Sequence, residues 1–219
     1  MLRLLSRLRD AYRAQGPMLP LAALRWLVRP EYLVIVREYG PDTPTYQARA
    51  NVRWALLTEA DLPALLDLSS SLSESDVRRL WSEGQECQAC WIDEALVFYR
   101  WDSMGPAYLS FLKRTYLPRP GDVLLSHAYT HPDHRARGLL SASSTVVAPR
   151  VRARGAVRVV ALVAWWNRPT LHVALDKYRH TVVGSVGYWN LGPWRWYFST
   201  GRVRLPGDGG LLVAEPVGE

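Results

Sequence analysis

The stretch Thr130-His-Pro-Asp-His-Arg-Ala-Arg-Gly-Leu-Leu140 decides the fold of this chain. The run before it, residues 123–130, mixes β-branched, aromatic and apolar residues and therefore predicts a strand. After it, apolar residues fall mainly on one face of a helical pattern. A strand that leads through such a turn into a helix N-terminus gathers unpaired N–H groups and the positive end of the helix dipole. Because Gly138 lets a phosphate approach and Arg135 and Arg137 supply charge, the stretch predicts a pyrophosphate site.

The same stretch resembles the acyl-CoA-binding motif of the GCN5-related N-acetyltransferase (GNAT) superfamily, Arg/Gln-x-x-Gly-x-Gly/Ala, with Arg135 and Gly138 at the matching positions. The chain departs from the motif at Leu140, where the family has Gly or Ala, and a bulky side chain there could crowd the loop. A basic helix N-terminus without a ligand is the alternative interpretation. The resemblance implies that acetyl-CoA or another acyl-CoA binds at Ala128, Tyr129, Thr130, Arg135, Ala136, Arg137, Gly138, Leu139, Leu140 and Asn167.

A second segment extends the resemblance. Residues 156–165 form a nearly continuous apolar, β-branched run, which predicts a strand buried on both faces. Asn167 and Thr170 follow at the positions of the family's Asn-x-x-Ser, so Asn167 is expected to reach the pantetheine arm or to cap the next helix. Arg179-His180 stands where the family has Gly-Phe. The resemblance covers about residues 51–203 and is strongest over residues 122–184.

This resemblance implies an α/β (α+β) fold with a GNAT-like mixed, mostly antiparallel central sheet and helices on both faces. We assign residues 1–50 to an N-terminal extension of two short helices, a strand over residues 32–37 and a linker. Residues 51–203 are the acyltransferase domain, and residues 204–219 a loose C-terminal tail. Residues 103–120 are long for a connection and predict a lid or a wall of the acceptor pocket, or else a satellite of the core. Pro149 is expected to kink or end the helix after the cofactor loop.

Composition limits the classes of function. The 219 residues are 48% hydrophobic, enough for one substantial core, and the formal net charge is +7. This basicity reflects either genome composition or attraction to polyanions such as coenzyme A, an acidic carrier protein or an anionic membrane. The sequence has no nucleic-acid-binding motif, so we expect no nucleic acid partner. It also has neither a signal peptide nor an apolar run long enough for a membrane span. Because nothing in it implies a disulfide framework, we expect a protein of the reducing cytoplasm.

Two features leave alternatives open. Residues 1–15 form a basic amphipathic pattern, which suits packing on the domain or a weak contact with a membrane surface. Cys87 and Cys90 are a lone pair with no further ligands for zinc, so we expect no metal and read both as small packed side chains. The cysteines give no disulfide framework. The sequence is also compatible with a homodimer.

Direct acyl transfer requires a base for the amine, polarisation of the thioester carbonyl and an acid for the departing thiolate. In the family, backbone N–H groups corresponding to residues 128–130 often polarise the carbonyl. His127 is our candidate base, chosen from His127, Tyr129 and His131, because the pKa of imidazole suits neutral pH. Leu175 stands where the family has its tyrosine acid. Tyr178 is the remaining candidate acid, with a packed aromatic as the alternative, and a water chain could replace a single base.

The sequence thus predicts an acyl-CoA-dependent N-acyltransferase that transfers an acetyl or other acyl group to the primary amine of a small molecule or peptide by direct attack. Two alternative functions belong to other classes of protein. One is a non-catalytic GNAT-like module that binds acyl-CoA or regulates, as the departures at Leu140, Leu175 and Arg179-His180 would allow. The other is a peripheral membrane or carrier-protein adaptor that uses the basic N-terminus.

Overall fold

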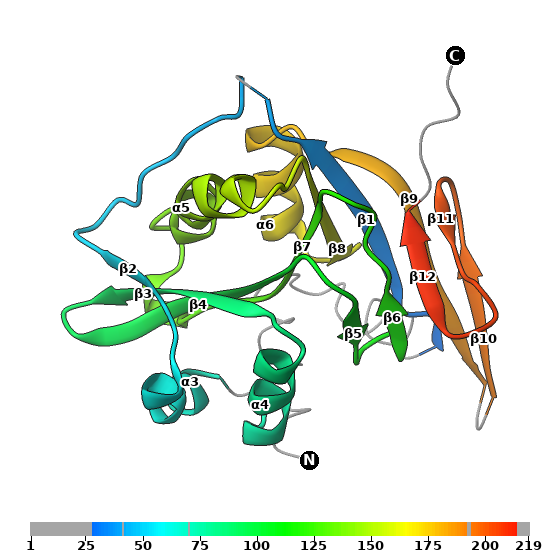
Figure 1. Ribbon diagram of the computed structural model, residues 1–219, viewed down its shortest axis with the longest axis horizontal. Coiled ribbons are helices and arrows are strands. Elements are labelled where there is room, and N and C mark those ends of the chain that lie inside the picture. The colour runs from blue at the N-terminus through cyan, green and yellow to red at the C-terminus, as the bar shows by residue number, and fades with distance from the viewer. Residues whose placement is uncertain (1–27, 41, 70, 192–193, 214–219) are drawn as a thin grey trace, which may run out of the picture.

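The computed structural model describes residues 28–40, 42–69, 71–191 and 194–213 (Figure 1). Its main sheet has the order β10-β9-β1-β8-β7-β4-β3-β2 in this part of the chain. The eight strands are β1 (Glu31–Glu38), β2 (Arg53–Leu56), β3 (Glu86–Ile92), β4 (Ala95–Ser103), β7 (Asp122–Thr130), β8 (Arg158–Ala164), β9 (Thr181–Leu191) and β10 (Trp194–Ser199). Neighbouring strands are antiparallel except β7 and β8, so the predicted mixed, mostly antiparallel sheet is confirmed.

Strand β1 lies in the middle of this sheet, antiparallel to β8 on one side and to β9 on the other. The strand predicted over residues 32–37 is therefore confirmed. Val34 and Ile35 are 0% and 1% exposed, as expected for a strand that is covered on both faces. The segment that we assigned to an N-terminal extension thus contributes a central strand to the sheet of the proposed acyltransferase domain.

Helices cover both faces of the main sheet, as predicted (Figure 1). On one face, α3 (Leu62–Leu68) and α4 (Glu74–Ser82) pack on β3 and β4 through a cluster that includes Tyr99 and Trp101. On the other face lie α5 (Leu139–Ala153) and α6 (Arg168–Leu171), which continues into the π-helix η4 (His172–Lys177). Two 3-10 turns, η2 (Glu59–Asp61) and η3 (Pro132–His134), precede α3 and α5.

The two cysteines lie in β3, which forms the expected hairpin with β4 through Asp93 and Glu94. Both turn residues have positive φ, 48° and 65°, as a tight hairpin with the twist of its strands requires. Cys87 packs in the cluster under α3 and α4, whereas Cys90 packs in a cluster on the opposite face. Both thiols are buried and free, and burial raises the pKa of each. Their interpretation as small packed side chains is confirmed.

A second sheet of order β11-β12-β6-β5 lies beside the main one (Figure 1). It comprises β5 (Ala107–Leu109), β6 (Arg114–Tyr116), β11 (Val203–Arg204) and β12 (Gly210–Val213). Its buried residues form one core cluster with β1 and β9 of the main sheet, so residues 103–120 are a satellite of the core. The prediction of a loose tail is wrong for residues 210–213. Leu211 is fully buried there because β12 pairs with β6 in parallel and with β11.

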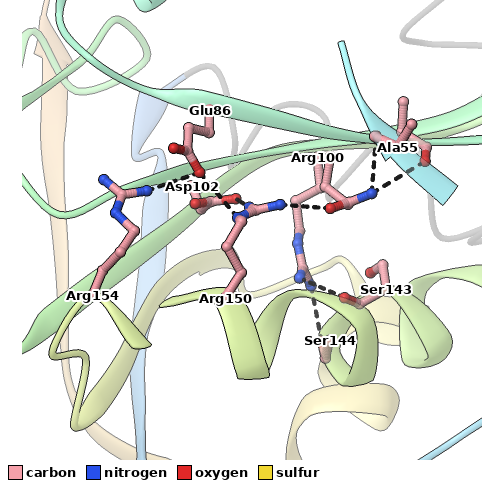
Figure 2. A network of polar contacts seen from close by, with 10 residues as sticks. Ala55, Glu86, Arg100, Asp102, Ser143, Ser144, Arg150 and Arg154 are labelled. Carbon is pink, nitrogen blue, oxygen red and sulfur yellow. Dashed lines mark hydrogen bonds and ion pairs between the residues drawn. The ribbon is translucent and has the colours of Figure 1, made fainter. Parts of the chain in front are cut away.

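Helix α5 does not end at Pro149 but runs on to Ala153, so the expectation that the proline ends the helix is wrong. Polar contacts hold its last turns to the sheet (Figure 2). Arg150 binds Asp102 and Glu86 with N···O distances of 2.6 and 3.0 Å, and Arg154 binds Glu86 at 2.8 Å. These ion pairs tie the part of the helix that follows the proline to the sheet.

Candidate active site

The main sheet opens between its two parallel strands. β7 and β8 pair from Asp122↔Arg158 to Leu125↔Ala161 and no further, although β7 continues to Thr130 and β8 to Ala164. Beyond these pairs, and within the described residues, β8 is bonded to β1 alone and β7 to β4 alone. The carboxyl ends of the two strands thus diverge, which is where open α/β sheets bind ligands. Among the described residues, no strand pairs with the edge of β7 that faces this opening, so its backbone N–H and C=O groups suit an extended ligand.

A β-bulge lies at the start of the opening. Trp101 of β4 pairs with Ser126, but Tyr99 pairs with Tyr129, so His127 and Ala128 together oppose Arg100. His127 has a φ of 45°, in the left-handed region that a histidine rarely adopts. Bulges re-aim side chains and free backbone groups from the ladder. This one lies at residues 127–128, at the start of the segment, residues 128–130, that is expected to polarise a thioester carbonyl.

His127 points to the α3/α4 face of the sheet. Its imidazole lines a cavity of about 120 Å³ whose other walls come from α4, the α3–α4 connection and the β5–β6 turn. Burial, reinforced by the positive charge of Arg79, lowers the pKa of His127, while Asp76 opposes this shift. The imidazole is therefore neutral near pH 7 and able to accept a proton. The other two candidates lie elsewhere: Tyr129 stacks on Tyr99, and His131 caps η3 beyond the end of β7.

The loop after β7 and the N-terminus of α5, here called the cradle, have the predicted strand–turn–helix geometry. Gly138 is the N-cap of α5 with a φ of 76°, a conformation that glycine adopts readily and that Ala136, at 62°, shares. The first turn of α5 leaves N–H groups without intrahelical acceptors, and these groups carry the positive end of the helix dipole. Arg135 and Arg137 are exposed beside it, and Arg135 Nε donates to the Thr130 carbonyl at 3.3 Å. These residues suit a phosphate or pyrophosphate ligand.

Leu139 and Leu140 have apolar surroundings. Leu139 is buried and Leu140 packs against the same cluster, which includes Phe98 and Cys90 of the hairpin. The bulk of Leu140 at the family's Gly/Ala position is thus accommodated by contacts with this cluster.

The linker before β2, within residues 41–50, contacts the cradle, which the sequence analysis did not predict. Arg49 N donates to the Arg137 carbonyl at 2.9 Å, and a Cβ at Gly138 would meet the Gln47 carbonyl at 3.6 Å. Tyr46 binds both flanking helices: its N–H donates to Thr145 of α5, and its hydroxyl donates to the Lys177 carbonyl of η4. The proline- and threonine-rich composition of residues 41–50 indicated a linker but gave no sign of the residues that it contacts.

The two candidates after β8 have structural contacts. Asn167 is the N-cap of α6, and its side chain accepts a hydrogen bond from Thr170 N at 3.3 Å. Tyr178 is 2% exposed, and its hydroxyl donates to the Ser141 carbonyl of α5. Burial raises the pKa of Tyr178. These contacts fit the capping interpretation of Asn167 and the packed interpretation of Tyr178.

Comparison with solved structures identifies the fold. The chain is similar to a putative GNAT-family acetyltransferase from Novosphingobium aromaticivorans, with 18% identity and a TM-score of 0.54 over 73% of this chain and 62% of that one. It is also similar to a tandem GNAT protein from the clavulanic acid biosynthesis pathway, with 15% identity and a TM-score of 0.50 over 84% of this chain and 57% of that one. This chain therefore spans less than two thirds of either structure.

The chain has the GNAT fold. No protein-family model matches the sequence, and no curated protein is significantly similar to it. In the described residues, none of the helices has the length and apolarity that a membrane span needs.

Proposed function

We propose that the protein is an acyl-CoA-dependent N-acyltransferase that transfers an acetyl or other acyl group to a primary amine. The observation that carries this proposal is the opening between β7 and β8, which leads directly to the cradle at the N-terminus of α5. The pantetheine arm would lie along the free edge of β7, with the pyrophosphate over residues 135–139. The N–H groups near Ala128 would polarise the thioester carbonyl.

His127 would accept the proton of the acceptor amine. It lies at the bulge, so its imidazole is next to the backbone that would hold the thioester, and its lowered pKa keeps it unprotonated at neutral pH. The amine nitrogen forms a bond to the acyl carbon, the carbon–sulfur bond breaks, and the thiolate of coenzyme A takes a proton from His127 or from water. Tyr178 is not needed for this step.

Thermal unfolding with acetyl-CoA and with free CoA tests the cofactor site. At about 100 times the Kd, either ligand should stabilise the protein by about 2.7 kcal/mol. Arg135→Glu should abolish this shift because it places a negative charge at the cradle. The matched control is Arg152→Glu, which makes the same charge change in the last turns of α5 and should keep the shift. No shift with either ligand at millimolar concentration would refute the proposal.

CoA release with a panel of amines tests catalysis. Release above the rate of spontaneous hydrolysis supports the enzyme. Binding of CoA without release by any amine would favour the non-catalytic module instead.

A further inference from the structure

The cavity beside His127 has a composition that bears on the acceptor. Its wall carries a carboxylate, a guanidinium, an imidazole and two hydroxyls, from Asp76, Arg79, His127, Ser71 and Ser110, together with the apolar side chains of Leu72 and Phe111. At about 120 Å³ it is smaller than the pockets of 300–1,000 Å³ that hold drug-sized ligands. It suits a molecule of a few heavy atoms.

Asp76 keeps one carboxylate oxygen for a ligand. As the N3 residue of α4, it completes a capping box with Ser73, and its Oδ2 accepts both the Ser73 N–H at 3.0 Å and the Ser73 hydroxyl at 2.6 Å. Among the described residues, no donor binds Oδ1 of Asp76. The hydrogen bonds from Ser73 lower the pKa of Asp76, so the carboxylate is ionised at neutral pH. A negative charge therefore faces the cavity.

Arg79 lies one helical turn further along α4, where positions i and i+3 share a face. Its Nη1 donates to Glu83 at 2.7 Å, and its guanidinium lies 5.5 Å from the ring of Tyr108. Within the described part of the chain, Nε and Nη2 have no acceptor. The cavity thus presents a carboxylate and a guanidinium one helical turn apart, close to a neutral imidazole, and the guanidinium also pairs with Glu83 through Nη1.

We infer that the acceptor is a small zwitterion of the α-amino acid class, with its ammonium group against Asp76 and its carboxylate against Arg79. An α-amino acid carries opposite charges on one carbon, which matches two opposite charges one turn apart on a helix. A small side chain would lie against Leu72 and Phe111. This inference rests on the proposed function, because the amine must reach a thioester at the bulge.

The reaction balances without a further reagent. The bound ammonium gives a proton to His127, and the free amine nitrogen attacks the acyl carbon. The new carbon–nitrogen bond replaces the carbon–sulfur bond, and the second amine proton is lost as the tetrahedral intermediate collapses. Protonated coenzyme A, the N-acyl amino acid and one proton to solvent are the products.

Two pairs of variants distinguish the effect of losing a charge in the cavity from the effect of making the same change in a helix cap or ion pair outside it. Asp76→Asn removes the charge but retains an oxygen for the capping box, and Asp61→Asn makes the same change in the capping box at Thr58, outside the cavity. Arg79→Gln removes the guanidinium in an i,i+4 ion pair, and Arg78→Gln does so in the neighbouring pair with Glu74. Asp61 and Arg78 do not line the cavity.

The experiment measures CoA release from acetyl-CoA with L-alanine and L-serine, and with alaninamide and serinamide, which lack the carboxylate. We expect kcat/KM for the free amino acids to fall at least about tenfold in Asp76→Asn and Arg79→Gln, mainly through KM. The amides should be poor acceptors, and Arg79→Gln should not weaken them further. The two control variants should stay within about twofold of the wild type. Stabilisation by acetyl-CoA should be the same in all five proteins.

Three results would overturn the inference. The first is equal use of the amides and the free amino acids. The second is CoA release with aromatic amines or peptide N-termini but not with the amino acids, which leaves the acyltransferase proposal standing. The third is release with none of these acceptors although acetyl-CoA stabilises the protein, which removes catalysis as well. Failure of acetyl-CoA to bind refutes the proposed function itself.

Discussion

The hydroxyl of Tyr178 lies between two groups of α5. It donates to the Ser141 carbonyl and shares a hydrogen bond with the Thr145 hydroxyl at 3.2 Å. Tyr178→Phe should therefore lower the free energy of unfolding by about 1 kcal/mol, because the Ser141 carbonyl loses a buried donor. Since the hydroxyl proton is already engaged, kcat should change by less than about twofold. Urea unfolding and CoA release measure the two effects, and a fall in kcat of about a hundredfold would instead identify Tyr178 as the thiolate acid.

The protonation of His127 should determine how the rate depends on pH. Because burial and the charge of Arg79 lower the pKa of its imidazole, kcat/KM should be level near neutral pH and should fall only below the pH at which a free imidazole titrates. His127→Gln should reduce kcat by about 10² to 10⁴ and remove the acidic fall. His131→Gln, just beyond the same strand, is the matched control and should retain the wild-type profile. A wild-type profile that already declines above pH 7 would contradict this role.

Among the ion pairs at the end of α5, the one between Arg150 and Asp102 has the most buried carboxylate (Figure 2). The Asp102 side chain is 1% exposed and binds Arg150 at 2.6 Å, and burial raises the pKa of Asp102 despite that partner. Arg150→Met leaves the carboxylate buried and unpaired, so we expect a loss of about 3–5 kcal/mol in the free energy of unfolding. Arg154→Met removes a half-exposed partner of Glu86 and should cost less than about 1 kcal/mol. Equal losses in urea unfolding of the two variants would contradict this assignment.

The helices and strands differ in how well the sequence predicts them. The β3–β4 hairpin, β7, the glycine turn and the start of α5 depend on local patterns and turn residues, and all were predicted. The place of β1 between β8 and β9, the second sheet and the passage of Tyr46 and Arg49 over the cradle depend on pairing between distant segments. A single sequence gives no signal for such pairing. The bulge at His127 was missed for a related reason, because it is defined by the register of β7 against β4.

In the molecule as a whole, the N-terminal segment supplies an interior strand of the main sheet. The packing behind that strand buries a titratable group. Arg37 of β1 lies 5.2 Å from the ring of Tyr178, and His180 packs against the same ring. Burial, with the charges of Arg37 and Arg100, lowers the pKa of His180 from 6.5 to about 4. The sheet, η4 and the start of β9 thus meet around an imidazole that is neutral in the folded protein.

Stability should therefore depend on pH in a defined direction. Between pH 6.5 and 4 the unfolded chain binds a proton at His180 that the folded chain does not, so acidification favours unfolding. The free energy of unfolding should fall by up to about 3 kcal/mol across this range from His180 alone, and the full contribution is retained above pH 6.5. Urea unfolding of the wild type and His180→Gln at several pH values measures the difference, in which the carboxylates common to both proteins cancel. We expect the variant to lose less stability on acidification, and parallel curves for the two proteins would show that His180 is not held neutral by the fold.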